Sequence, residues 1–120
     1  MSIAGSIPAA QALALADLIT PTKQGIASRV LAKTGGGNVT LFAFDQGEGL
    51  SEHTAPFDAL VLVLEGCVDI TIAGTPVTAT PGTIVRMPAH VPHALEAASA
   101  ARMLLVMLRE PVTPHNASAP

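Results

Sequence analysis

The chain lacks tryptophan and tyrosine and has a single cysteine among its 120 residues. Tryptophan and tyrosine supply the rings that stack most often on sugars, so their absence argues against carbohydrate binding. The lone cysteine, Cys67, excludes an internal disulfide. Because no histidine lies near it in the sequence to activate a thiolate, we expect Cys67 to be structural.

Charge is also scarce, and positive charge most of all. Six Lys and Arg stand against nine Asp and Glu, which gives a net charge of -3 and no run of positive residues. A nucleic-acid surface needs clustered cations that displace phosphate counterions, so nucleic acid is excluded as a partner. The longest uncharged apolar run, Ala59 to Leu64, is too short to span a bilayer, and no membrane partner is expected.

The first residues resemble a secretion signal only in their alanine content. Met1 to Ile19 has no Lys or Arg ahead of its apolar part, is interrupted by Pro8, carries Asp17 and shows no clear cleavage pattern. These features are not those of a cleaved signal. We therefore expect a mature, cytoplasmic protein.

Hydrophobic residues, by contrast, make up 49% of the chain, and charged residues only 12%. A chain of this length forms one domain without help from disulfides. Its composition requires much of the chain to be hidden, either in a core or in a subunit contact. We therefore expect a homodimer whose terminal segments help to cover exposed strand edges.

From residue 25 onward, short apolar strands alternate with turn residues. Gly35 to Asn38 and Pro81-Gly82 mark tight turns, since glycine adopts the backbone conformations that such turns need. Strands are expected at 26–33, 39–45, 60–64, 67–72, 77–80, 83–87, 94–97 and 102–109. Eight or nine such strands without a long helix predict an all-β, antiparallel sandwich or barrel of the jelly-roll type.

This pattern divides the chain into three parts. Residues 1–24 form an N-terminal arm or a short helix, because Ala9 to Ile19 has the composition for about three helical turns and is equally compatible with an extended arm. Residues 25–110 form the barrel. Residues 111–120 form a C-terminal tail.

Two segments place histidines next to strands. In the first, Gly49 to Gly66, His53 stands at a turn ahead of an unbroken apolar strand. In the second, Pro81 to His93, a strand leads through a proline-rich loop to the histidine. The order and spacing of glycines, prolines and histidines resemble the two motifs of the cupin superfamily, in its small single-domain cupin 2 type. The resemblance covers nearly the whole predicted barrel.

The resemblance implies a double-stranded β-helix, usually dimeric, with a pocket at one mouth of the barrel. It also implies a metal site made of two histidines and a glutamate from the first motif and one histidine from the second. His53 and His93 match the first and last of these positions, but Ala55 and Ala59 stand at the other two. Cupins include dioxygenases, isomerases, decarboxylases and non-enzymatic binders, so the fold alone leaves the activity open.

A metal site would need a third donor. Imidazole is a common ligand of transition metals, and a catalytic site usually has three protein ligands and an open position. The candidate donors are His90, three residues before His93, and Asp58. One hypothesis is therefore a divalent zinc, iron, nickel or manganese ion held by His53, His93 and His90. The alternative is that His53 and His93 are neutral pocket histidines bonded to water or backbone, and that His90 faces solvent.

Apolar side chains complete the candidate pocket. Phe42 and Phe44 share one face of their strand, and Phe57, Met87 and Met107 offer further soft apolar surface. Most of this surface is expected in the core. The rest would line a cavity with a few imidazoles at its mouth.

Charged residues near the two motifs have ordinary explanations. Glu52 alternates with His53 and is expected to point away from the pocket, and Asp58 is expected to be a turn or surface carboxylate. Arg86 lies inside an apolar strand. If it points inward it would meet a substrate carboxylate, and if it points outward it would pair with an acid, which is the more ordinary arrangement.

Three functions fit these residues. The leading interpretation is a small-molecule binder, a carrier or sensor, that keeps the barrel pocket and a reduced histidine site able to hold a divalent metal. The second is a metal-dependent enzyme of the dioxygenase or isomerase type that uses His53 and His93 as ligands. The third is a packed structural subunit without a ligand. Metal content and pocket volume distinguish the three.

Overall fold

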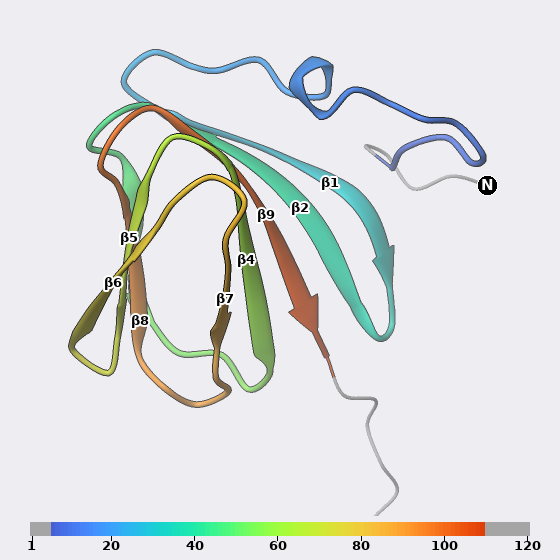
Figure 1. The fold of residues 1–120 in the computed structure, drawn as a ribbon. Coiled ribbons are helices and arrows are strands. Elements are labelled where there is room, and N and C mark those ends of the chain that lie inside the picture. Colours follow the sequence, from blue (N-terminus) through green and yellow to red (C-terminus); the bar gives the residue numbers. More distant parts are fainter. Residues whose placement is uncertain (1–5, 110–120) are drawn as a thin grey trace, which may run out of the picture.

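The computed structural model describes residues 6–109, which fold into two antiparallel β-sheets (Figure 1). The strands are β1 (Ile26–Thr34), β2 (Gly37–Phe44), β3 (Gly49–His53), β4 (Asp58–Glu65), β5 (Val68–Ile72), β6 (Thr75–Ala79), β7 (Ile84–Met87), β8 (His93–Ala97) and β9 (Ala101–Leu108). One sheet has the order β1-β2-β9-β4-β7, and the other has the order β3-β8-β5-β6. The predicted all-β, antiparallel jelly-roll fold is confirmed. The predicted tail, residues 111–120, lies outside the described residues.

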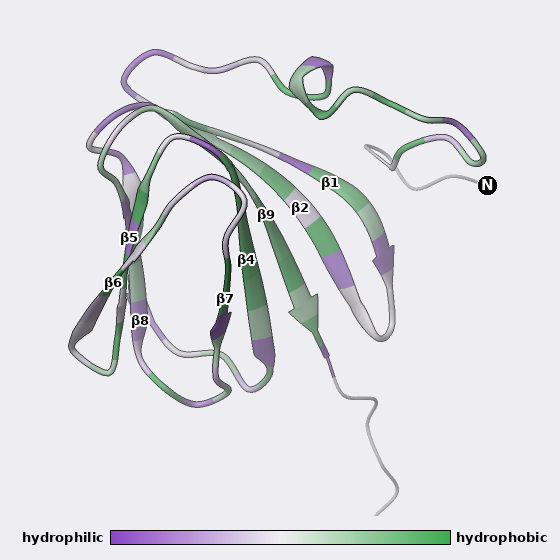
Figure 2. Cartoon of the chain, in the orientation of Figure 1, coloured by the Kyte–Doolittle hydropathy of each residue, from purple (hydrophilic) through white to green (hydrophobic). Residues whose placement is uncertain are grey.

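Strand β4, near the middle of the larger sheet, is apolar on both of its faces. Ala59, Val61 and Val63 point toward the other sheet and are at most 5% exposed. The three leucines at positions 60, 62 and 64 lie on the opposite, outer face and are half-buried. Figure 2 shows the same hydrophobic character along β4 and β9. Because side chains alternate along a strand, such a sequence needs cover on both sides of the sheet.

The inner cover comes from the smaller sheet, and part of the outer cover comes from the N-terminal arm. Of the helix considered for Ala9 to Ile19, only a 3-10 turn forms, at Leu15–Asp17. Ile19 packs in a cluster with Leu31 on the outer face, and the Ile7 amide donates a hydrogen bond to the Leu31 carbonyl at 2.9 Å. Short helices gain little from their own hydrogen bonds, so these contacts favour an extended arm. No helix in residues 6–109 has the length and hydrophobicity of a membrane span.

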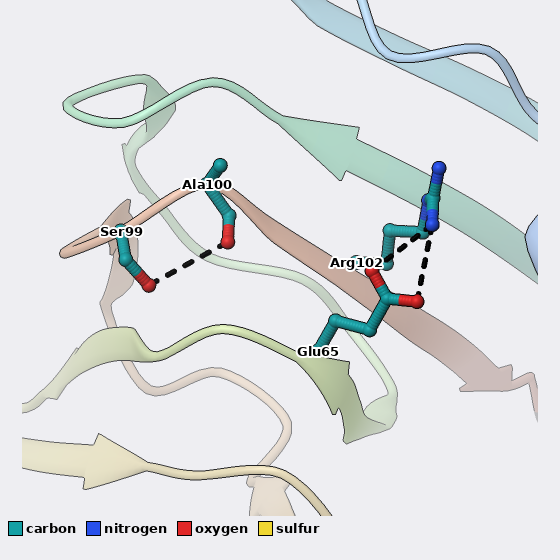
Figure 3. A network of polar contacts seen from close by, with 4 residues as sticks. All are labelled: Glu65, Ser99, Ala100 and Arg102. Carbon is teal, nitrogen blue, oxygen red and sulfur yellow. Dashed lines mark hydrogen bonds and ion pairs between the residues drawn. The ribbon is translucent and has the colours of Figure 1, made fainter.

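Polar contacts lie at the end of the larger sheet opposite the loops 54–57 and 88–92 (Figures 1 and 3). Arg102 on β9 donates to both oxygens of the Glu65 carboxylate, at 2.9 and 3.1 Å. The Ser99 hydroxyl accepts a hydrogen bond from the Cys67 amide at 3.0 Å, and the Cys67 side chain is half-buried. These contacts tie β4 to β9, and the turn after β4 to the loop before β9.

Glycine at position 66 is required by a close approach of two backbones. Gly66 has a φ of 71°, and a Cβ there would lie 2.1 Å from the Ala100 carbonyl oxygen. Gly74 has a similar φ of 80° but no atom within 4 Å of a built Cβ. Alanine substitutions at the two positions therefore separate two free-energy costs. Both variants strain the left-handed backbone, and only the one at position 66 also clashes with Ala100.

We predict that Gly66→Ala lowers the free energy of unfolding by about 3 kcal/mol, because backbone strain and forced displacement of β9 add together. The matched variant Gly74→Ala should lose only about 1 kcal/mol, from the left-handed conformation alone. Urea denaturation of both variants measures the difference. Equal losses would show that the approach of Ala100 is not a rigid constraint.

The homodimer expected from composition stays a prediction, and the outer face of the larger sheet is where we expect it to form. Ile84 and Leu108 on this face are 58% and 46% exposed. Light scattering at micromolar concentration should give about twice the chain mass of 12.2 kDa. Ile84→Glu should weaken the dimer because it places a charge on an apolar face, whereas Thr75→Glu, on the other sheet, should not. A monodisperse monomer of the unmodified chain would refute the prediction.

Candidate functional site

The two motif histidines are neighbours on paired strands. His53 does not stand at a turn, as expected from the sequence, but is the last residue of β3, an edge strand that the sequence pattern did not reveal. Strand β3 pairs with β8, and His53 lies opposite His93, the first residue of β8. The strands approach closely at Gly49, where a Cβ would lie 2.0 Å from the Leu95 carbonyl oxygen. Both imidazoles consequently reach the same cavity.

The two imidazoles meet through their Nε2 atoms, which are 3.2 Å apart. Their ring centroids are 4.4 Å apart, and the rings are inclined by 70°. His93 is buried, at 4% exposure, whereas His53 is exposed. The pair thus joins the interior of the barrel to its surface.

Backbone carbonyls determine which ring nitrogens carry hydrogen. The Nδ1 of His53 lies 2.8 Å from the Ser51 carbonyl, and the Nδ1 of His93 lies 3.1 Å from the Val91 carbonyl. A carbonyl can only accept, so each Nδ1 is the donor, and in a neutral ring each Nε2 is then an acceptor. Two acceptors face each other and cannot satisfy one another. The pair needs a proton, a ligand donor or a cation between its nitrogens.

A cavity of about 160 Å³ lies next to the histidine pair. Apart from the two histidines, its walls are Leu50, Ala55, Phe57, Ala59, Met87, Leu95, Leu105 and Met107, with no charged side chain among them. An apolar cavity of about 150 Å³ in another protein binds benzene, so this one has room for a single small ring.

A small residue in the middle of the inner face creates the cavity. Ala59 on β4 lies between Met87 on β7 and Met107 on β9 in the strand register. A larger side chain in this row would fill the space between the two thioethers. Ala55 also lines the cavity, so both alanines at the two vacated metal-ligand positions border open space beside the histidines.

The structure brings three of the five candidate pocket residues to the cavity. Phe57, Met87 and Met107 line it, whereas Phe42 and Phe44 do not. The rings of Phe42 and Phe44 instead stack in the core, nearly parallel and with centroids 5.6 Å apart. They do share one face of β2, as expected, but β9 separates that strand from β4 and the cavity.

Leucines of the cavity wall were missed although a signal was present. Leu95 follows His93 by two residues on β8, and Leu105 precedes Met107 by two on β9, so each shares a face with a named residue. Leu50 gave no such signal, because the β3–β8 register shifts between Leu50 and His53.

His90 is not brought to the histidine pair. Its backbone has a φ of 64°, its amide donates to the Ala55 carbonyl at 2.7 Å, and its exposed side chain lines a different hollow. The described residues contain no group of three or more His, Cys, Asp or Glu side chains placed to hold a metal ion. The three-nitrogen site of His53, His93 and His90 is therefore not formed.

Asp58 and Arg86 pair with each other on the outer face of the sheet. Arg86 Nη1 donates to Asp58 Oδ2 at 2.9 Å, and the Ala89 amide donates to Asp58 Oδ1 at 2.8 Å. The Ala89 hydrogen bond, with a further contribution from Arg86, holds the pKa of Asp58 below its ordinary value. Asp58 thus fixes the start of the 88–92 loop, and Arg86 points outward rather than into the cavity.

The donor set fits part of a metal site. A separation of 3.2 Å allows both Nε2 atoms to bind one ion, since nitrogen–metal bonds are about 2.0–2.1 Å long. The carbonyl contacts at both Nδ1 atoms are those that orient metal-binding histidines. His53 and His93 therefore fit as two ligands of one ion. Ala55 and Ala59 have no donor atoms, so the protein does not supply the other two ligands of the family's usual site.

The fold and site define a class: a small antiparallel jelly-roll barrel with a histidine pair at one mouth. A family profile described as "Cupin domain" matches residues 40–108. The chain therefore belongs to the cupin family.

Solved structures support this assignment. A conserved protein of unknown function, SPY1581 from Streptococcus pyogenes, is 33% identical, with a TM-score of 0.85, and the match covers 93% of this chain and 98% of that one. A cupin superfamily protein from Desulfitobacterium hafniense DCB-2 is 30% identical, with a TM-score of 0.81, covering 88% and 96%. KdgF from Halomonas sp., at 21% identity, a TM-score of 0.67 and coverage of 76% and 86%, shares the fold. No curated protein matches the chain.

We predict that a single substitution, Ala55→His, creates a three-nitrogen zinc site, because position 55 borders the cavity beside both histidines. Zinc at about 100 times its Kd should then raise the free energy of unfolding of this variant by about 2.7 kcal/mol. Zinc titration followed by thermal unfolding measures the effect. The unmodified chain and Ala55→Gln are the controls, and both should respond much less. An equal response of all three proteins would contradict the prediction.

Proposed function

We propose that the barrel cavity binds a small, largely apolar molecule of about the size of benzene that carries one hydrogen-bond donor. The observation that supports this proposal is the convergence of two Nε2 acceptors, 3.2 Å apart, at the edge of an apolar cavity of about 160 Å³. A hydroxyl placed at the pair donates to one Nε2 and satisfies an acceptor that the protein itself leaves without a donor. The apolar walls hold the rest of the molecule.

The expected affinity is modest. A single-ring ligand has few atoms, and its binding free energy should fall at about −4 to −8 kcal/mol, which is the millimolar to micromolar range. Most of it comes from removing apolar surface from water. The histidines contribute selectivity, because a ligand without a donor would leave the buried His93 nitrogen unsatisfied at a cost of about 1–3 kcal/mol.

A fully packed structural barrel is a poorer explanation. The row of Met87, Ala59 and Met107 leaves open space where a larger residue at position 59 would pack. A protein selected only for packing gains stability when such a space is filled. The cavity therefore favours binding over a purely structural role.

A second candidate is a metal-dependent activity, and the short Nε2–Nε2 distance favours it as well. In that case His53 and His93 would hold a divalent ion, which would act as a Lewis acid toward an oxygen of the substrate. The two carbonyls at Nδ1 would keep both rings oriented, and the apolar walls would exclude water from the substrate. Elemental analysis of the protein purified without a histidine tag separates the candidates. Stoichiometric metal, lost in a His53→Ala, His93→Ala double variant, would establish the second.

We predict that metal-free protein, prepared with a chelator, binds phenol at least fivefold more tightly than anisole, because anisole has a similar ring but no donor for the Nε2 atoms. Isothermal titration calorimetry or shifts of the histidine ring signals in NMR measure both affinities. The double variant His53→Ala, His93→Ala, which removes both Nε2 acceptors, should remove the preference for phenol.

Two further variants serve as controls. Ala59→Val should weaken both ligands because it occupies the cavity, and Thr75→Ala, on β6 away from the cavity, should affect neither. Equal binding of phenol and anisole to the unmodified chain, or no binding of either, would refute the proposal.

A further inference from the structure

A second hollow, of about 490 Å³, lies outside the barrel at the same end as the cavity. It is formed by the β1–β2 turn, the end of β9, the start of β4 and the 88–92 loop, which Figure 1 shows at this end of the molecule. Phe57 lines both the inner cavity and this outer cleft. Its ring is therefore the wall between an apolar space and a polar one.

Arg109 brings a cation to this wall. Its guanidinium carbon lies 5.2 Å from the centroid of the Phe57 ring, and its amide donates to the Gly36 carbonyl at 2.8 Å, which fixes the backbone at the end of β9. Within residues 6–109, the ion pairs are Arg86 with Asp58 and Arg102 with Glu65, and neither involves Arg109. The planar guanidinium therefore offers its donors to a ligand from a position beside the mouth of the cavity.

The other polar groups of the cleft leave this positive charge in excess. Among the described residues that line the cleft, Asp58 is the one carboxylate, and it is already bound by Arg86 at 2.9 Å and by the Ala89 amide at 2.8 Å. His90 also lines the cleft, and either tautomer of a neutral imidazole supplies one N–H donor. The cleft thus presents a cation and a neutral donor to anything that lies across Phe57.

We propose that the cleft binds the carboxylate of the ligand, through Arg109 and the His90 imidazole. This inference rests on the proposed function and narrows its ligand to a class, the single-ring hydroxy acids. The hydroxyl would lie at the histidine pair, the ring in the apolar cavity, and the carboxylate in the cleft, which it would reach past the edge of the Phe57 ring. His90 would then donate a hydrogen bond to the ligand carboxylate rather than bind a metal ion.

Para-hydroxybenzoate and the neutral para-hydroxybenzamide, which has nearly the same shape, form the test pair. Calorimetric titration of the metal-free protein should show the acid binding about fivefold more tightly than the amide, as expected for an ion pair near the surface. Arg109→Gln should remove this difference by weakening the acid only. Arg109→Lys should keep part of it, because the charge stays but the planar pair of donors is lost. His90→Ala should reduce it.

The control is Lys23→Gln, which removes one positive charge from an exposed turn outside both hollows and should leave both affinities unchanged. Arg109 and Lys23 are both exposed, and thermal unfolding checks that the variants stay folded.

Three outcomes would contradict the inference in different ways. If the amide binds and the preference for the acid is absent or survives Arg109→Gln, the anion site is wrong and the cavity proposal stands. If neither compound binds, and phenol does not bind either, both proposals fail. If Arg109-dependent binding of the acid is unaffected by Ala59→Val, the acid occupies the cleft alone, and the link across Phe57 is wrong.

Discussion

The need to bury apolar residues on both faces of one sheet determines most of this structure. Strand β4 has branched aliphatic side chains on its inner and outer faces, and β9 pairs with it along its length. The inner face is covered by the smaller sheet, which produces the two-layer barrel. The outer face is covered in part by the arm through Ile19. The cavity is a local exception to this packing, made where the inner row contains an alanine between two methionines.

The character of the site depends on the alanines at positions 55 and 59, which border the cavity beside the two histidines. With histidine and glutamate at positions 55 and 59, the cavity would be filled by ligands around a cation. With alanine at both positions, the same space is apolar, and two imidazoles face it. The Nδ1 atoms of His53 and His93 donate to the Ser51 and Val91 carbonyls, which fixes the orientation of both rings. Both rings thus have a fixed orientation toward a cavity whose other walls are apolar.

The sequence was sufficient for the fold because its signals are local. Alternating apolar residues and glycines such as Gly66 and Gly74 place most strands and turns without reference to distant contacts. Strand β3 was missed because it is an edge strand whose Ser51, Glu52 and His53 are exposed, so it shows no apolar alternation. The arm was left open between helix and extended chain, since the deciding contact, Ile19 against the outer sheet, joins distant segments.

The site was only partly predictable for the same reason. His53 and His93 could be paired through their motifs. The Ser51 and Val91 carbonyls that fix their tautomers could not be predicted, because their direction depends on the local backbone conformation before each histidine. Phe42 and Phe57 were both candidate pocket aromatics, and the strand order places Phe42 in the core, away from the cavity that Phe57 lines. Arg109, at the end of the last predicted strand, was not among the candidate site residues. Its position over Phe57 joins residues far apart in sequence, and no pattern in the sequence encodes that contact.

The two methionines that flank Ala59 have a consequence for how the cavity adapts to different molecules. Thioether side chains are unbranched and polarizable, and they change rotamer at little cost. A wall built from Met87 and Met107 therefore yields to the outline of a ring more easily than one built from valine or isoleucine would. Shape is then a weak filter at this site. Under the proposed function, several related compounds would share this cavity, and the polar groups at its two ends would select among them.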